Sequence, residues 1–193
     1  MANTSAPFGF RQYSGNGSAP TYEQVAVRIA YNASAIFYGD PVLPDVSGYV
    51  VVGAPGTTQI AGVFSGCKYL SVSQKRTVWS NYWPGSDVAS NQTVEGYIIN
   101  DPNARFIAQT GATGAVYGDI NANVNFAIGT GNTATGISGA SVDMTTVGGT
   151  STLPFRIVSL DIDPPGAPGT EAGAYNLVIV AFNNVSTKQL AGI

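Results

Sequence analysis

The chain has 193 residues and a formal net charge of −3, and only 10% of its residues are charged, against about 25% in an average soluble protein. Its eight Lys and Arg residues form no basic stripe, and no apolar run approaches the roughly 20 residues of a membrane span, so we expect neither nucleic-acid nor membrane binding. There is no histidine, the commonest general base and metal ligand, so we expect no enzyme and no bound metal or cofactor.

The first 21 residues predict an extended N-terminal arm. They are rich in Gly, Ser, Asn and Pro, yet they contain Phe8, Phe10 and Tyr13. Such a segment has too few apolar groups to fold alone and too many aromatic rings for a simple linker, so we expect it to become ordered against another surface. We therefore divide the chain into an arm, residues 1–21, and a β-rich domain, residues 22–193. We expect deletion of residues 1–13 to leave this domain folded.

From residue 22 onward the sequence predicts short β-strands. In residues 22–31 every second side chain is apolar, from Val25 to Tyr31, which is the period of a half-buried strand. Further strand-like runs follow at residues 35–39, 49–53, 59–71, 76–83, 94–100, 104–110, 123–128, 140–147, 153–160 and 175–182. About eleven short strands, separated by turn sequences such as Pro84-Gly85, predict an all-β fold with a single β-barrel or β-sandwich body.

Two later regions have a more specific interpretation. Residues 175–182 are apolar at almost every position, so we expect a central strand that is buried on both faces or covered by a neighbouring subunit. Residues 129–149 are nearly uncharged and rich in Gly, Thr and Ser, and we expect long loops with one strand inside them. The proline-rich residues 161–175 predict an irregular exposed loop.

The segment 76–85 holds both tryptophans of the chain. If it is a regular strand as far as Trp83, then Trp79 and Trp83 share one face, while Val78 and Tyr82 share the other. Both faces then need cover, one from the core and the other from a further core layer, another chain or a ligand. Trp79, Tyr82 and Trp83 are therefore candidates for a subunit interface, or for a platform on which a sugar or a base stacks.

Several segments together resemble, in order, a family of tailed-bacteriophage virion structural proteins of the capsid decoration (cement) type. They are APFGF followed by Arg11, SAIFYGDPV (34–42), IAGVFSGCKY (60–69), SNYWPG (80–85), DPNARFIAQ (101–109), GTGNTATGISGASVD (129–143) and FRIVSLDIDP (155–164). The resemblance implies a β-rich module on the outer surface of the phage head. Such a module forms a homotrimer, clamps neighbouring major capsid subunits and stabilises the DNA-filled shell.

This resemblance gives the N-terminal arm a role. Phe8, Phe10, Arg11 and Tyr13 become candidates for docking on the major capsid protein, with the aromatic rings buried against it and the guanidinium hydrogen-bonded to it. The implied location is the virion, after assembly in the host cytoplasm. The alternative hypothesis is a receptor- or carbohydrate-binding module on a head fibre or tail, with Trp79, Tyr82 and Trp83 as its stacking platform.

Overall fold

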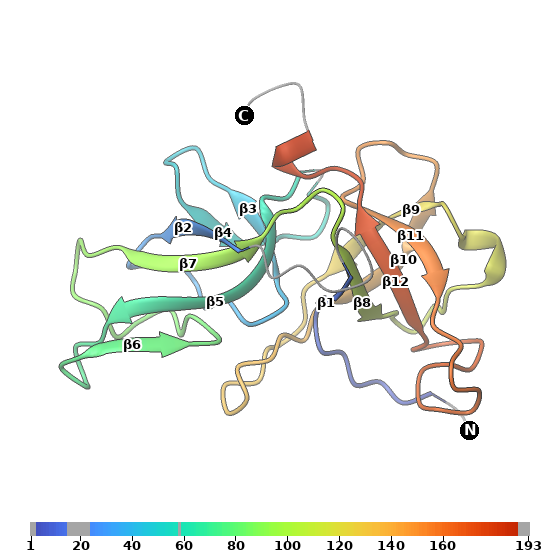
Figure 1. The fold of residues 1–193 in the computed structure, drawn as a ribbon, viewed down its shortest axis with the longest axis horizontal. Helices are drawn as coiled ribbons and strands as arrows, with labels where there is room; N and C mark the ends of the chain where they lie inside the picture. The colour runs from blue at the N-terminus through green and yellow to red at the C-terminus, as the bar shows by residue number, and fades with distance from the viewer. Residues whose placement is uncertain (1–2, 15–23, 58, 189–193) are drawn as a thin grey trace.

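The computed structural model describes residues 3–14, 24–57 and 59–188. These residues form twelve strands in two antiparallel sheets of six strands each, with two 3-10 turns, η1 (Tyr117–Asp119) and η2 (Ser186–Lys188). The predicted all-β fold is therefore confirmed. The two sheets lie side by side, one at the left and one at the right of Figure 1.

The first sheet, which we call the barrel sheet, curls until its two sides meet. Its strands are, in order, β1 (Arg11–Ser14), β8 (Arg105–Gln109), β12 (Leu177–Phe182), β11 (Phe155–Leu160), β9 (Asn123–Ala127) and β10 (Ser141–Gly148). A bridge between Thr110, just after β8, and Val142 of β10 joins the two sides. The predicted strand at 175–182 is indeed central, because β12 lies between β8 and β11.

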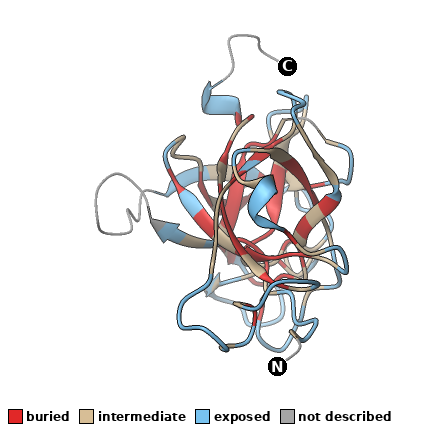
Figure 2. Cartoon of the chain, turned by 90° about the vertical axis from the view of Figure 1, so that its right-hand side faces the viewer, coloured by how far each residue is buried: buried red, intermediate tan, exposed pale blue. Residues whose placement is uncertain are grey.

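Aromatic rings fill the barrel sheet. Phe155 lies at their centre: its ring stacks on Phe10 with 4.4 Å between centroids and on Phe182 at 5.7 Å, and it meets Phe106 and Phe126 edge-on. All five rings are buried. Figure 2 shows these buried strand segments at the centre, with exposed loops around them. Burial of each such ring contributes about 1.5–3 kcal/mol to folding before entropy is counted.

The second sheet, which we call the open sheet, has its own core. Its strands are, in order, β2 (Val25–Ile29), β7 (Val94–Ile99), β5 (Gly62–Leu70), β3 (Pro41–Pro44) and β4 (Val50–Val52), and β6 (Thr77–Ser80) also pairs with β5. Its inner face buries a cluster that includes Ile29, Phe64 and Trp83. The expected single body therefore contains two adjoining hydrophobic cores.

The observed strands depart from the predicted ones near residues 35–44 and inside the arm. Residues 35–39 form no strand, because only isolated bridges occur there, from Ile36 to Trp83 and from Tyr38 to Ile137. The strand begins instead at Pro41, where a missing N–H is tolerated because the residue is the first of its strand. The other difference is β1, which forms inside the predicted arm and pairs with β8 through backbone hydrogen bonds.

A buried carboxylate, Asp40, joins the two sheets. Its Oδ2 atom accepts a hydrogen bond from the Phe37 N–H at 2.7 Å, and its Oδ1 atom accepts one from the Ser138 hydroxyl. The Ser138 oxygen in turn accepts from the Ala140 N–H at 2.8 Å, immediately before β10. Burial raises the pKa of Asp40, although the hydrogen bond from Ser138 opposes that shift. The carboxylate thus connects the start of β3 with the start of β10.

Replacing Asp40 by alanine is expected to lower the free energy of unfolding by about 2–4 kcal/mol, because the Phe37 N–H and the Ser138 hydroxyl lose their acceptor in a buried site. Urea denaturation of the purified chain measures this loss. Asp45→Ala is the matched control, because that carboxylate accepts from the Ser47 N–H in an exposed turn; we expect a loss of about 1 kcal/mol or less. Equal losses for the two variants would contradict a structural role for Asp40.

The single cysteine is buried in the core of the open sheet. Cys67 is 2% exposed, and desolvation by burial raises its pKa to about 12. Because the thiolate is the reactive species, the folded protein is expected to resist a thiol reagent such as Ellman's reagent at pH 8 and to react with one equivalent after denaturation. Fast labelling of the native protein would show that β5 and β6 open readily.

Candidate interaction surfaces

The tryptophan-rich segment does not continue as a regular strand. β6 ends at Ser80, the chain bends at Asn81 and Tyr82, and Trp83 then pairs with Ile36 instead of with β5. The bend turns the Trp83 side chain inward, so the prediction that Trp79 and Trp83 share one face is wrong. Trp83 is fully buried, and its ring N–H donates to the Ala33 carbonyl at 3.2 Å. It belongs to the core of its own chain.

Only one of the three predicted interface residues is widely exposed. Tyr82 is half-buried, and its ring lies parallel to that of Phe37 with 5.3 Å between centroids. Trp79, in contrast, is 68% exposed. The candidate surface in this region therefore centres on Trp79.

Trp79 is held by a row of side chains on the outer face of the open sheet. Trp79 lies opposite Lys68 of β5, and Lys68 lies opposite Glu95 of β7, so the three side chains share a face. Nζ of Lys68 is 5.1 Å from the indole centroid and 2.9 Å from Oε2 of Glu95. The Tyr97 hydroxyl donates to Oε1 of Glu95 at 2.7 Å, and the Tyr97 ring lies parallel to the indole at 5.8 Å. We call these four residues the Trp79 cluster.

The two charges of the Trp79 cluster compensate each other. Hydrogen bonds from Tyr97 and Lys68 lower the pKa of Glu95, and the hydrogen bond to Glu95 raises the pKa of Lys68. Both groups therefore stay ionised and paired at neutral pH.

A hollow of about 500 Å³ lies beside the Trp79 cluster, and Trp79 and Tyr97 are among the residues that line it. Gly66 lines it at a β-bulge of β5 and has a φ of +150°, and a Cβ atom there would lie 3.0 Å from the Ser80 carbonyl oxygen. The remaining lining residues are Gln24, Ser65, Cys67, Ser80 and Asn81. We call this feature the Trp79 hollow.

The described part of the predicted arm is bound to the chain's own body. Gln109 accepts a hydrogen bond from the Ala6 N–H at 2.8 Å and donates one to the Thr4 carbonyl at 2.9 Å. The Phe10 N–H donates to the Gly39 carbonyl at 2.9 Å, and the Phe10 side chain is 1% exposed in the barrel core. Phe10 is therefore not available to a partner, contrary to the role expected for it. Residues 1–2 and 15–21 of the arm lie outside the described residues.

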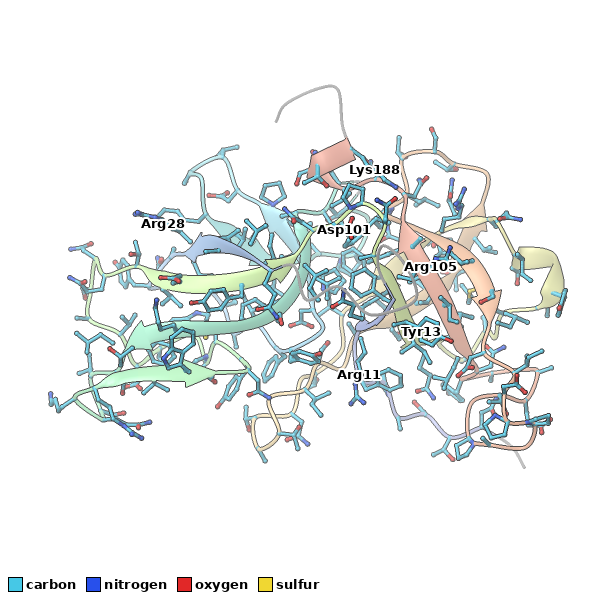
Figure 3. The ribbon with its side chains drawn as sticks, in the orientation of Figure 1. Arg11, Tyr13, Arg28, Asp101, Arg105 and Lys188 are labelled. Atoms are coloured by element: carbon cyan, nitrogen blue, oxygen red, sulfur yellow. The ribbon has the colours of Figure 1, made fainter. Side chains whose placement is uncertain are left out.

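Three other arm residues remain on the surface. Phe8 is half-buried, and the guanidinium of Arg11 lies over its ring at 4.6 Å from the centroid. Tyr13 is 50% exposed. Figure 3 shows Arg11 and Tyr13 on β1, next to Arg105 of the adjacent β8.

Arginines gather on the outer face of the barrel sheet. Arg11 of β1 lies opposite Ile107 of β8, whose side chain is on the same face of the sheet as that of Arg105. Arg105 and Arg156 both lie opposite Ala181 of β12, so the three arginines share one face. All three arginines are exposed, and their neighbours Phe106 and Phe155 point into the core. The strands β1, β8, β12 and β11 contain no acidic residue. We call this surface the arginine face.

Sequence reasoning missed Lys68, Glu95 and Tyr97 as partners of Trp79. The sequence did contain a signal for Lys68. One predicted strand ends at residue 71 and the next begins at residue 76, which is the spacing of a hairpin. If residues 71 and 76 pair, the same register pairs Lys68 with Trp79, as observed. No local signal places β7 beside β5, because the two strands pair across a long stretch of chain.

Within the described residues, no cluster of three or more His, Cys, Asp or Glu side chains is arranged to hold a metal ion. The described residues also contain no helix that is both long enough and apolar enough to span a membrane. Comparisons with protein-family models, with curated proteins and with solved structures found no match for this chain.

Proposed function

We propose that the protein is a capsid decoration protein that binds the outer surface of a tailed-phage head and clamps neighbouring major capsid subunits. The arginine face carries this proposal. Three arginines, Arg11 of β1, Arg105 of β8 and Arg156 of β11, point outward from one side of the barrel sheet, and neither these strands nor β12 between β8 and β11 contains an acidic residue, although the chain as a whole has a net charge of −3. Such a local excess of positive charge favours a partner surface rich in carboxylates.

The N-terminal residues extend this face. Phe8 and Tyr13 place two aromatic rings beside Arg11, and interfaces are enriched in aromatic and arginine side chains. A guanidinium bound to a carboxylate forms charge-assisted hydrogen bonds, and the rings add apolar contact. The segment APFGF with Arg11 is also one of those on which the resemblance to decoration proteins rests.

Segments that carry the resemblance pack together where the two sheets meet. The Gly9 N–H donates to the Ala140 carbonyl, the Tyr38 N–H donates to the Gly136 carbonyl, and the Asn81 amide donates to the Thr135 carbonyl at 2.7 Å. The first of these bonds, together with the Phe10 N–H bond to the Gly39 carbonyl, holds the segment before Arg11 at a fixed place on the body. A rigid docking face loses less entropy on binding than a mobile arm.

Binding to a symmetric shell strengthens modest contacts. On this proposal copies of the chain associate as homotrimers on the head, so each trimer engages several capsid subunits at once. Linked contacts of this kind raise the effective affinity far above that of one site.

The test is binding of the purified chain to expanded heads that lack it, followed by cosedimentation and cryo-electron microscopy. We expect saturable binding that weakens with added salt, and density at symmetric positions on the outer surface of the head. Absence of binding at low salt, or density confined to the tail, would contradict the proposal.

A further inference from the structure

The Trp79 cluster keeps a large aromatic side chain both exposed and fixed. The indole is 68% exposed, yet Lys68 and Tyr97 both contact it, and Glu95 ties these two residues together. A tryptophan that is exposed without a role on the surface does not require contacts that fix its ring in one position. Groups that bind a ligand are commonly held in place in this way by the side chains behind them.

The hollow beside the indole depends on Gly66. On the neighbouring β7, Tyr97 lies opposite Gly66, so the position opposite Tyr97 adds no side chain to the hollow. The register shift between Phe64 and Gly66 marks a β-bulge, a feature that often lies next to functional sites. The resulting volume of about 500 Å³ falls within the roughly 300–1,000 Å³ typical of ligand pockets.

Polar side chains surround the aromatic pair. The Gln24 amide nitrogen donates to the Ser65 hydroxyl at 2.7 Å, and the Asn81 amide nitrogen donates to the Thr135 carbonyl at 2.7 Å. Each bond fixes a side-chain amide whose carbonyl oxygen is able to accept a hydrogen bond from a hydroxyl. The hollow therefore combines a flat apolar surface with oriented uncharged polar groups.

The charges in the cluster disfavour an ionic ligand. Lys68 and Glu95 are bound to each other at 2.9 Å, so a phosphate or a carboxylate has to break an existing ion pair to gain a partner. An uncharged ligand with one apolar face and several hydroxyl groups leaves the pair intact. A sugar ring in the pyranose form has this chemistry, since its C–H face packs on the negative face of an aromatic ring.

We propose that the Trp79 hollow binds uncharged sugar rings of an oligosaccharide, with Trp79 and Tyr97 stacking on the sugar and Gln24 and Asn81 accepting from its hydroxyl groups. This site lies on the open sheet, whereas the arginine face lies on the barrel sheet (Figure 1). It is therefore separate from the proposed capsid contact. A decoration protein with such a site presents a second, glycan-binding surface.

The test begins with the purified chain on an array of neutral and acidic oligosaccharides, followed by titration of the best neutral ligand. Tryptophan fluorescence reports binding directly, because Trp79 is exposed and Trp83 is fully buried. We expect the ligand to change the emission and to protect Trp79 from quenching by acrylamide. Trp79→Ala lacks this reporter and is compared with wild type on the array; we expect it to bind about tenfold more weakly, within the range found when a ring stacked on a nucleobase is removed.

Three further variants make the result specific. Trp79→Phe retains an aromatic ring and is expected to bind more tightly than Trp79→Ala, and Tyr97→Ala is expected to weaken binding. Tyr117→Ala is the matched control, because Tyr117 is 73% exposed but lies outside the hollow; we expect its binding to be unchanged. Circular dichroism checks that each variant is folded.

Several outcomes would overturn the inference. They are no binding to any neutral oligosaccharide at millimolar concentration, a preference for acidic sugars, or equal binding by wild type and Trp79→Ala. Stacking of a nucleobase or of a proline-rich peptide in the hollow, with no sugar bound, would also overturn it. The capsid proposal is tested separately, because Trp79→Ala is expected to leave cosedimentation with heads unchanged.

Discussion

Replacing Phe10 by alanine is expected to lower the free energy of unfolding of the isolated chain by about 3–5 kcal/mol, the usual cost of removing a buried aromatic ring. Phe10 is 1% exposed and stacks on Phe155, the central ring of the barrel core, at 4.4 Å. The substitution leaves a cavity against Phe155 and loosens the attachment of β1. Urea denaturation monitored by circular dichroism measures the loss.

Phe8→Ala provides the matched control. Phe8 is half-buried on the surface and contacts Arg11, so its removal is expected to cost about 1 kcal/mol or less. Deletion of residues 1–13 is expected to destabilise the chain at least as much as Phe10→Ala, because it removes the same ring together with most of β1. The buried position of Phe10 therefore argues against the expectation that the domain stays folded after this deletion. Unchanged stability of Phe10→Ala would show that this residue acts only on a partner.

Strands could be predicted where side-chain pattern alone determines them. β5, β7, β8, β11 and β12 fall inside the predicted runs, because alternating or continuous apolar residues require one buried face or two. β3 was missed because Pro41 and Pro44 indicate a turn, although both are tolerated at the ends of a short strand. β1 was missed because its sequence, RQYS, is polar, and it forms through backbone pairing with β8.

The candidate site could be predicted only in part. Trp79 and Trp83 were identified as candidates for an interface or a stacking platform, but strand parity assigned them to one face. The bend that separates them lies at Asn81 and Tyr82, and neither residue is a proline or glycine that would have predicted it. The bend arises from tertiary contact: the Trp83 backbone exchanges hydrogen bonds of 2.8 and 2.9 Å with Ile36. Pattern within one strand carries no information on such a change of partner.

Long-range packing also hides the arginine face from the sequence. Arg105 and Arg156 are far apart along the chain. They come to lie on either side of Ala181 because β12 pairs with β8 on one side and with β11 on the other. From the sequence alone, the Lys and Arg residues were therefore interpreted as forming no basic stripe. Once the strand order is known, three of them share one surface, and an electrostatic mode of binding becomes testable.

Removing the charge of the arginine face is the second prediction with a large expected effect. The triple variant Arg11→Ala, Arg105→Ala, Arg156→Ala is expected to bind expanded heads about 30- to 150-fold more weakly, a loss of about 2–3 kcal/mol. The loss arises because charge-assisted hydrogen bonds to capsid carboxylates disappear and electrostatic attraction during encounter is reduced. Cosedimentation at several salt concentrations measures it, and the salt dependence of the variant is expected to be shallower than that of wild type.

The matched control is the triple variant Arg28→Ala, Lys75→Ala, Arg76→Ala. It changes the net charge by the same three units, and all three residues are exposed outside the barrel sheet, as Figure 3 shows for Arg28. If only overall charge mattered, both triple variants would bind equally weakly, and the arginine face would have no special role. If the face is the docking surface, the control retains near wild-type affinity, since its charges lie on the open sheet and in the hairpin that joins β5 to β6. The difference between the two variants therefore separates local contact from general attraction, which falls off within about 10 Å at moderate salt.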